Sequence, residues 1–149
     1  MFVTAETIVN VPIDTAWQEF NDKEQSTHWI QSLQHVESLT GAPLTPGTKL
    51  RYIYKEGGRD NEMTEEIMAV DAPNRIDSVY ETKVMRSDQS FRFESVGNGQ
   101  TKIIGEMRLK PTHIVMRLML FFFKGAVRKR LQGDLDRFRE LINKKYASA

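Results

Sequence analysis

Hydrophobic and polar residues alternate along most of this chain, which is the pattern of strands with one buried face. Near the amino terminus Val3, Ala5, Thr7 and Val9 alternate with a second set of mainly polar residues, which predicts a strand. Gly, Pro, Asn and Asp residues then separate several strand-like segments from one another. The segments expected to be strands are 33–39, 49–55, 62–70, 76–85, 90–96 and 101–109, with turns that include Ser87-Asp88 and Asn98-Gly99.

Three other segments show the spacing of helices. Ile13, Ala16, Trp17 and Phe20 recur at helical intervals after Pro12, so a short amphipathic helix is expected there. A second short helix is expected over 23–30, with Trp29 facing inward. After Pro111 the pattern becomes helical, and from Val127 onward the apolar residues follow one stripe, which predicts a helix over 114–144, about 45 Å long at 1.5 Å per residue.

The order of these elements predicts an α+β fold in one domain covering residues 1–149. Six consecutive antiparallel strands must bury one face, and only the last helix is long enough to cover it. A curved sheet wrapped around a single helix leaves a gap where its curvature exceeds the reach of the side chains. We therefore expect a cavity between the sheet and the helix.

The start of the long helix is unusual because residues 118–123 are all large and apolar. Six such residues on a helix point in every direction rather than along one stripe. The run is too short to span a membrane, which takes about 20 apolar residues. A cavity, a partner chain, a lipid or a bound apolar ligand should therefore cover part of this surface.

Charge is distributed unevenly along the chain. Residues 1–111 hold 12 Lys and Arg against 17 Asp and Glu, whereas residues 112–149 hold 9 against 3. The basic helix is an ordinary solvated face or a surface attracted to anionic membranes; nucleic acid is not expected, because no base-reading motif accompanies the charge. The chain has no cysteine and its amino terminus does not read as a signal peptide, so we expect a cytoplasmic protein.

Three groups of residues carry a resemblance to a known superfamily. They are Val11–Trp17 followed by Phe20, Asp22 and Trp29, then Leu44–Leu50, and then Asp71–Ile76. With this order of elements the chain resembles the START-like (SRPBCC) superfamily, the helix-grip fold of polyketide cyclases, lipid-transfer domains and birch-pollen-type allergens. The resemblance implies a β-α-α-β6-α fold that holds a small apolar or amphipathic ligand. It supplies no superfamily-wide catalytic residue, so the catalytic residues are unknown.

Aromatic and methionine residues are the candidates for the cavity wall, although the same residue types also fill ordinary cores. The residues expected to bind ligand are Trp29, Tyr52, Tyr54, Met68, Tyr80, Phe91, Phe93, Met107, Met116, Leu120, Phe123 and Val127. Inward tyrosine hydroxyls would orient a ligand carbonyl or hydroxyl group. The three histidines, His28, His35 and His113, lack the spacing of metal ligands, so no metal is expected, and His28 is a conceivable general base. No phosphate-binding loop or nucleotide fingerprint is present, so no cofactor is expected either.

These observations favour a carrier or sensor of a small hydrophobic molecule such as a lipid, an isoprenoid or a polyketide-like compound. Two alternatives stay open: a polyketide cyclase or dehydratase-like enzyme, and an interaction module that uses the basic helix and Phe121–Phe123. The interaction module would be co-chaperone-like or would contact an anionic membrane peripherally. The chain is expected to be a monomer, or a homodimer that buries the same apolar residues.

Overall fold

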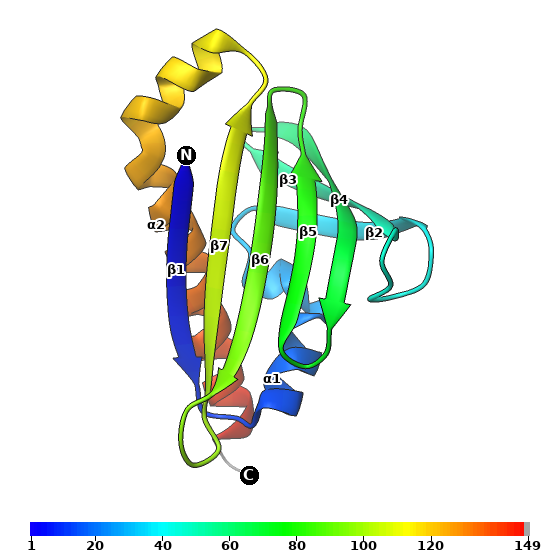
Figure 1. The fold of residues 1–149 in the computed structure, drawn as a ribbon, viewed down its shortest axis with the longest axis vertical. Coiled ribbons are helices and arrows are strands. Elements are labelled where there is room, and N and C mark those ends of the chain that lie inside the picture. Colours follow the sequence, from blue (N-terminus) through cyan, green and yellow to red (C-terminus); the bar gives the residue numbers. More distant parts are fainter. Residues whose placement is uncertain (148–149) are drawn as a thin grey trace.

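The computed structural model describes residues 1–147 and confirms the α+β order expected from the pattern (Figure 1). The elements are β1 (Phe2–Val9), α1 (Ile13–Phe20), the 3₁₀ helix η1 (Gln25–His28), β2 (Leu33–Thr40), β3 (Lys49–Glu56), β4 (Arg59–Asp71), β5 (Arg75–Glu81), β6 (Met85–Ser95), β7 (Thr101–Pro111) and α2 (Ile114–Tyr146). Neither α-helix in this part of the chain is long and apolar enough to cross a membrane.

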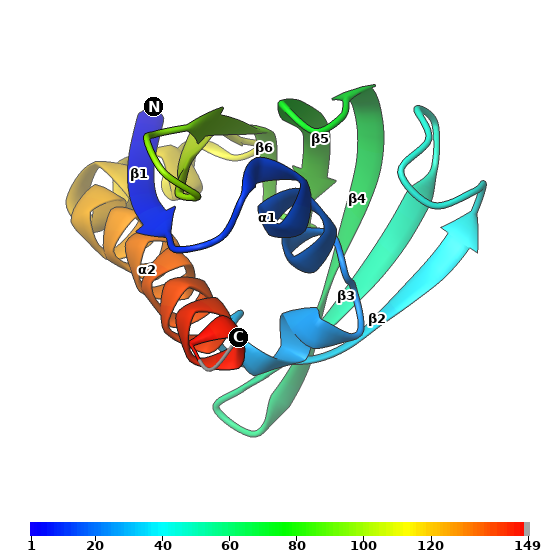
Figure 2. The same ribbon diagram turned by 90° about the horizontal axis from the view of Figure 1, so that it is seen from below.

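The seven strands form one antiparallel sheet in the order β1-β7-β6-β5-β4-β3-β2. Strands β2 to β7 follow one another as a meander, and the last strand, β7, pairs with the first strand, β1. The sheet curves strongly, and all three helices lie on its concave side (Figure 2). Helix α2 packs against β1 and β7 at one end of the sheet, so the concave face farther along, toward β3, stands away from it.

Side-chain alternation explains how the strands face this interior. Along β1, residues alternate strictly between exposed and buried, and Val3, Ala5, Thr7 and Val9 point inward as expected. The centre of the core is aromatic: the Phe138 ring lies 5.4 Å from Phe20 and 5.1 Å from Trp29, centroid to centroid. Helix α1 thus packs against the carboxyl-terminal half of α2 through Phe20 and closes that end of the interior.

The boundary between the fifth and sixth strands differs from the prediction. A strand was expected over 76–85 with a turn at Ser87-Asp88, but β5 ends at Glu81 and β6 begins at Met85. The turn forms around Thr82, whose Oγ1 accepts hydrogen bonds from the backbone N–H groups of Val84 and Met85. Val84 and Met85 made the segment read as a continuing strand, so the turn at Thr82 was missed. The polar Ser87, expected in a turn, is instead buried inside β6.

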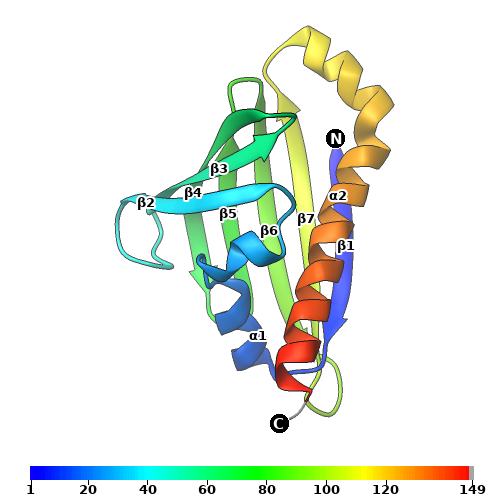
Figure 3. The same ribbon diagram turned by 180° about the vertical axis from the view of Figure 1, so that it is seen from behind.

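The second short helix is also shorter than expected, because only Gln25–His28 form a 3₁₀ helix within the predicted range 23–30. Strand β4 begins earlier than expected, at Arg59, so the β3–β4 hairpin extends through the polar residues 59–61. This longer hairpin projects toward α2 and forms one edge of the opening described below (Figure 3).

Within the single chain, the apolar surface of the first turns of α2 is mostly uncovered, so of the four covers expected for it the cavity is not one. Residues Ile114–Phe123 lean away from the sheet beyond the end of β7 (Figure 3). Seven large apolar side chains of this segment are exposed, namely Ile114, Val115, Leu118, Met119, Phe121, Phe122 and Phe123. Only Leu120 is buried, because a helix lying on the edge of a sheet can turn just one face inward.

Candidate binding cavity

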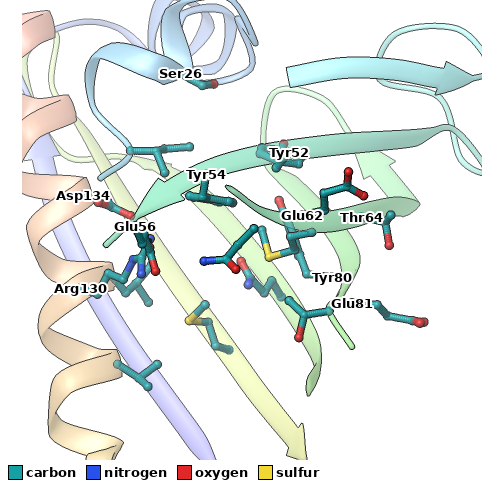
Figure 4. Close-up of a pocket in the computed structure, with 18 of the residues that line it drawn as sticks. Ser26, Tyr52, Tyr54, Glu56, Glu62, Thr64, Tyr80, Glu81, Arg130 and Asp134 are labelled. Carbon is teal, nitrogen blue, oxygen red and sulfur yellow. The ribbon is translucent and has the colours of Figure 1, made fainter. Parts of the chain in front are cut away.

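A cavity of about 1030 Å³ lies between the concave face of the sheet and α2. Residues from α1, η1, β3, β4, β5, β6, β7 and α2 form its wall, and Figure 4 shows many of them. The cavity opens between the β3–β4 hairpin and the β5–β6 turn, where Asp60, Asn61, Glu62, Lys83 and Val84 are exposed. A volume of this size is at the upper end of the range for small-molecule sites.

Seven of the twelve residues expected to bind ligand line this cavity. They are Trp29, Tyr52, Tyr54, Tyr80, Phe91, Met107 and Val127. The four aromatic residues of the strands come from β3, β5 and β6, so they cover the concave face of the sheet in one patch. Trp29 lies at the end of η1, and its Nε1 donor has no hydrogen-bond partner among residues 1–147.

Two of the strand residues do not reach the cavity. Met68 is 51% exposed on the convex face, because its neighbour Ile67 occupies the inward position of β4 and successive side chains point to opposite faces. Phe93 points inward but is almost completely buried between Trp17 and Phe20, with centroid distances of 5.2 and 5.3 Å. It therefore belongs to the packing beneath α1.

Three helix residues also lie outside the cavity. Met116, Leu120 and Phe123 belong to the first turns of α2, which extend past the cavity. The helix contributes instead from Val127 onward, through Val127, Arg130, Leu131, Asp134 and Leu135, which share one helical face. Of the four helix residues predicted, Val127 lines the cavity, whereas the other three precede it because the prediction assumed that the most apolar part of the helix faces the sheet.

A buried polar cluster forms one part of the cavity wall. Tyr52 Oη donates a hydrogen bond of 2.6 Å to Glu65 Oε1, and Tyr80 Oη donates one of 2.8 Å to Glu65 Oε2. Lys23 Nζ donates to Tyr52 Oη at 3.0 Å and lies 3.6 Å from Glu65 Oε1. Glu65 is almost fully buried behind the two tyrosines, whereas Lys23, Tyr52 and Tyr80 line the cavity.

Electrostatics fix the protonation states of this cluster. Burial raises the pKa of Glu65, but Lys23 and hydrogen bonds from Ser78, Tyr52 and Tyr80 outweigh it, so the pKa lies below its usual value. Burial, reinforced by the negative charge of Glu65, raises the pKa of both tyrosines well above the ordinary range. At neutral pH Glu65 is therefore a carboxylate, and the hydroxyls of Tyr52 and Tyr80 are neutral.

Glu65 and Lys23 were missed in the sequence, although one signal was present. Met63, Glu65 and Ile67 share the inward face of β4, so a carboxylate stands between two apolar residues on a buried face. A charged residue at such a position needs a partner. The partner comes from the loop before η1, 42 positions away, and no local pattern indicates that contact.

A second set of polar contacts joins α2 to β3 on the opposite side (Figure 4). Arg130 pairs with Glu56 at 2.7 Å, and its guanidinium carbon lies 5.5 Å from the centre of the Tyr54 ring. Asp134 accepts the backbone N–H of Gln31 at 3.0 Å and pairs with Arg137; burial nevertheless raises its pKa above the usual value. These contacts hold α2 to the edge of the cavity.

The chain matches one family model, described as polyketide cyclase / dehydrase and lipid transport, over residues 2–143. The chain belongs to this family. No curated protein matches it. The family's name covers both enzymes and lipid carriers, so membership supports a ligand-binding or cyclase-type function and leaves the ligand open.

Solved structures of the same fold share little sequence with this family member. The Zhui aromatase/cyclase from Streptomyces sp. R1128 superposes with a TM-score of 0.81 at 15% identity, covering 100% of this chain and 98% of that one. Ara h 8.0201 gives 0.76 at 16% identity over 97% and 98%. A START superfamily protein from Mycobacterium smegmatis gives 0.75 at 15% identity over 94% and 97%. These likenesses confirm the predicted helix-grip fold.

Proposed function

We propose that this chain is a carrier or sensor that binds a small, neutral, amphipathic molecule in the cavity. The observation that carries the proposal is the composition of the wall. Apolar side chains from seven elements surround the space, and the Lys23–Tyr52–Tyr80 group occupies one position in it. Sites for small molecules commonly combine an apolar wall with a few fixed polar groups that orient the ligand.

The pairing of charges favours a neutral ligand. Lys23 is balanced by Glu65, and Arg130 is balanced by Glu56, so both of these cations of the inner wall already have an anionic partner. Lys23 nevertheless has three N–H donors, and among residues 1–147 only Tyr52 accepts one within hydrogen-bond distance. A ligand hydroxyl or carbonyl oxygen would accept another. A ligand with a free carboxylate would lose the hydration of that group on binding. It would also be repelled by the negative charge of Glu65, which lies directly behind Tyr52 and Tyr80.

The protonation states favour binding over acid–base catalysis. A general acid or base works best when its pKa lies near the operating pH. The pKa of Glu65 is lowered and the pKa values of Tyr52 and Tyr80 are raised, so each moves away from neutrality. His28, considered above as a general base, is exposed and does not line the cavity. This arrangement supports a carrier or sensor over a cyclase.

The proposal is tested by filling the cavity. Val127 faces it from α2, whereas the adjacent Ala126 is exposed and does not line it. The neutral dye Nile red should bind the wild-type protein and gain fluorescence, and Val127→Trp should weaken this binding at least tenfold. Ala126→Trp adds the same side chain outside the cavity and should leave binding unchanged. Equal titrations for all three proteins would overturn the proposal.

The neutral character of the ligand is tested by competition. Oleyl alcohol and oleate share one hydrocarbon chain and differ in the charge of the head group. Oleyl alcohol should displace Nile red more effectively, and Lys23→Met should weaken its competition about tenfold by removing a charged donor. Lys55→Met, which removes an exposed cation of β3 outside the cavity wall, is the control. Stronger competition by oleate would show that the ligand is anionic.

A further inference from the structure

The exposed start of α2 forms a surface that the cavity does not explain. We call the side chains of Ile114, Val115, Leu118, Phe121 and Phe122 the apolar ridge. Phe121 and Phe122 are 77% and 78% exposed, which is unusual for phenylalanine in a folded chain. Single exposed apolar residues are normal, but a contiguous group of large ones marks an interaction site.

Helical geometry gathers the ridge on one face. Ile114, Leu118 and Phe122 are each four residues apart, so they follow one another along the helix, with Phe121 and Val115 on either side. Leu120 lies on the opposite face and is buried, which anchors the segment to the protein. The ridge therefore points away from the sheet and from the cavity.

Positive charge accompanies the ridge along the helix. Residues 114–133 contain five Lys and Arg and no Asp or Glu. Arg117, Lys124 and Arg128 lie at neighbouring angles on one flank of the ridge, by the rotation of about 100° per residue. All three are exposed, and none lies within 4.0 Å of a carboxylate in the described part of the chain.

We propose that the apolar ridge docks on an anionic lipid surface. A helix with a large apolar face and basic residues beside it lies in the plane of the membrane interface, its apolar side chains among the lipids and its cations near the head groups. A second copy of the chain fits less well. In an antiparallel two-fold pair of ridges, Arg117, Lys124 and Arg128 of both copies would lie on the same side of the interface, and residues 114–133 supply no acid to compensate them.

The position of the ridge relates docking to the cavity. The backbone N–H of Thr112, two residues before α2, donates a hydrogen bond of 3.1 Å to the carbonyl oxygen of Val84. Val84 lies at the opening of the cavity. A docked ridge therefore holds the opening beside the lipid surface. The transfer of a ligand between membrane and cavity rests on the proposed function, whereas docking itself does not.

Docking is tested by co-sedimentation with phosphatidylcholine vesicles prepared with and without phosphatidylserine. Binding should require phosphatidylserine and weaken at high salt. The double variant Phe121→Ser/Phe122→Ser should bind at least tenfold more weakly. Met68→Ser, which removes an exposed apolar side chain from the convex face, should bind like the wild type.

The contribution of charge is tested separately. The variant Lys124→Gln/Arg128→Gln should weaken binding at low salt by about fivefold for each charge removed. Its control, Lys49→Gln/Lys144→Gln, removes two exposed cations elsewhere on the protein. The decrease in the logarithm of the vesicle-binding constant should be less than half as large in the control. Equal losses in the two charge variants would indicate attraction by net charge alone and would overturn a docking site at the ridge.

Two further results would overturn the inference. One is vesicle binding that is unchanged in Phe121→Ser/Phe122→Ser. The other is the absence of vesicle binding together with a dimer in light scattering that this variant dissociates, since the ridge would then bind a second copy. Nile red titration without vesicles should be unaffected in every ridge variant, because the ridge lies outside the cavity. A failure of docking is thus distinguishable from a failure of cavity binding.

Discussion

The most informative single substitution is Glu65→Gln, which keeps the shape of a buried side chain and removes its charge. Glu65 accepts hydrogen bonds of 2.6 and 2.8 Å from Tyr52 and Tyr80 and lies 3.6 Å from Lys23. A glutamine oxygen can accept one of the two hydroxyl protons. Its NH₂ group cannot accept the other, so one tyrosine must rotate its hydroxyl or lose its partner.

The expected cost follows from these contacts. Hydrogen bonds to a charged group contribute about 1.5–3 kcal/mol each, and here one is lost and the other is weakened. The loss of the ion pair adds less than about 1 kcal/mol, because the Lys23 side chain is 27% exposed and can reach water. Removal of a buried charge offsets part of the total. Glu65→Gln should therefore lower the free energy of unfolding by about 2–4 kcal/mol at neutral pH.

Urea unfolding followed by tryptophan fluorescence measures this change, because Trp17 and Trp29 are both buried in the core. The control is Glu66→Gln, the next residue of β4, which faces outward and lies 4.0 Å from Lys49. It should change the free energy of unfolding by less than about 0.5 kcal/mol. A Glu65→Gln protein as stable as the control would show that the carboxylate does not stabilise the fold.

The dependence on pH provides a second readout. The pKa of Glu65 is lowered in the folded protein, so its stabilising contribution is fully present above the usual value of 4.5. It is lost as the pH falls through the lower folded value, where the wild-type side chain also becomes neutral. The difference in stability between wild type and Glu65→Gln should therefore be constant near neutrality and shrink in acid. A difference that grows as the pH falls would refute the assignment.

Two further substitutions test the packing around the cavity. Phe138→Ala removes a fully buried ring that contacts Phe20 and should cost about 3–5 kcal/mol in urea unfolding, whereas Phe122→Ala on the exposed ridge should cost less than about 0.5 kcal/mol. Gly105→Ala should lower the free energy of unfolding by about 1–3 kcal/mol, because the added Cβ would come within 2.8 Å of Cε1 of Phe91. The affinity for Nile red should also change, because the Phe91 ring lines the cavity and must shift. Unchanged stability and affinity would show that the ring moves freely.

Local patterns were sufficient to predict the elements of this fold. Alternation along 3–9 predicted β1, and glycine-containing turns at Gly57-Gly58 and Asn98-Gly99 separated the strands that flank them. The pattern failed at Thr82–Val84, where a turn is stabilised by the Thr82 side chain and not by glycine or proline. A turn held by a threonine side chain has the same residue types as a strand, so the sequence alone does not reveal this boundary.

The cavity wall was predictable only in part, for a reason of geometry. Aromatic residues on the inward face of a curved sheet, such as Tyr52 and Tyr80, must lie near any gap beneath it, and they line the cavity. Where a long helix crosses that gap depends on its register against the sheet, which no periodicity in one sequence determines. The prediction chose Met116, Leu120, Phe123 and Val127, and of these only Val127 lines the cavity, which the helix meets from that residue onward.

The two halves of α2 place different demands on its sequence. From Val127 onward the helix needs one apolar stripe, because only one face meets the sheet, and Leu131, Leu135, Phe138 and Ile142 supply it. Before Val127 the helix has Leu120 for that purpose, and its additional apolar side chains gain nothing from folding because they stay in water. Seven exposed large apolar residues in ten therefore require an explanation outside the fold of the single chain. Contact with a surface that is both apolar and anionic explains these side chains together with the unpaired cations beside them.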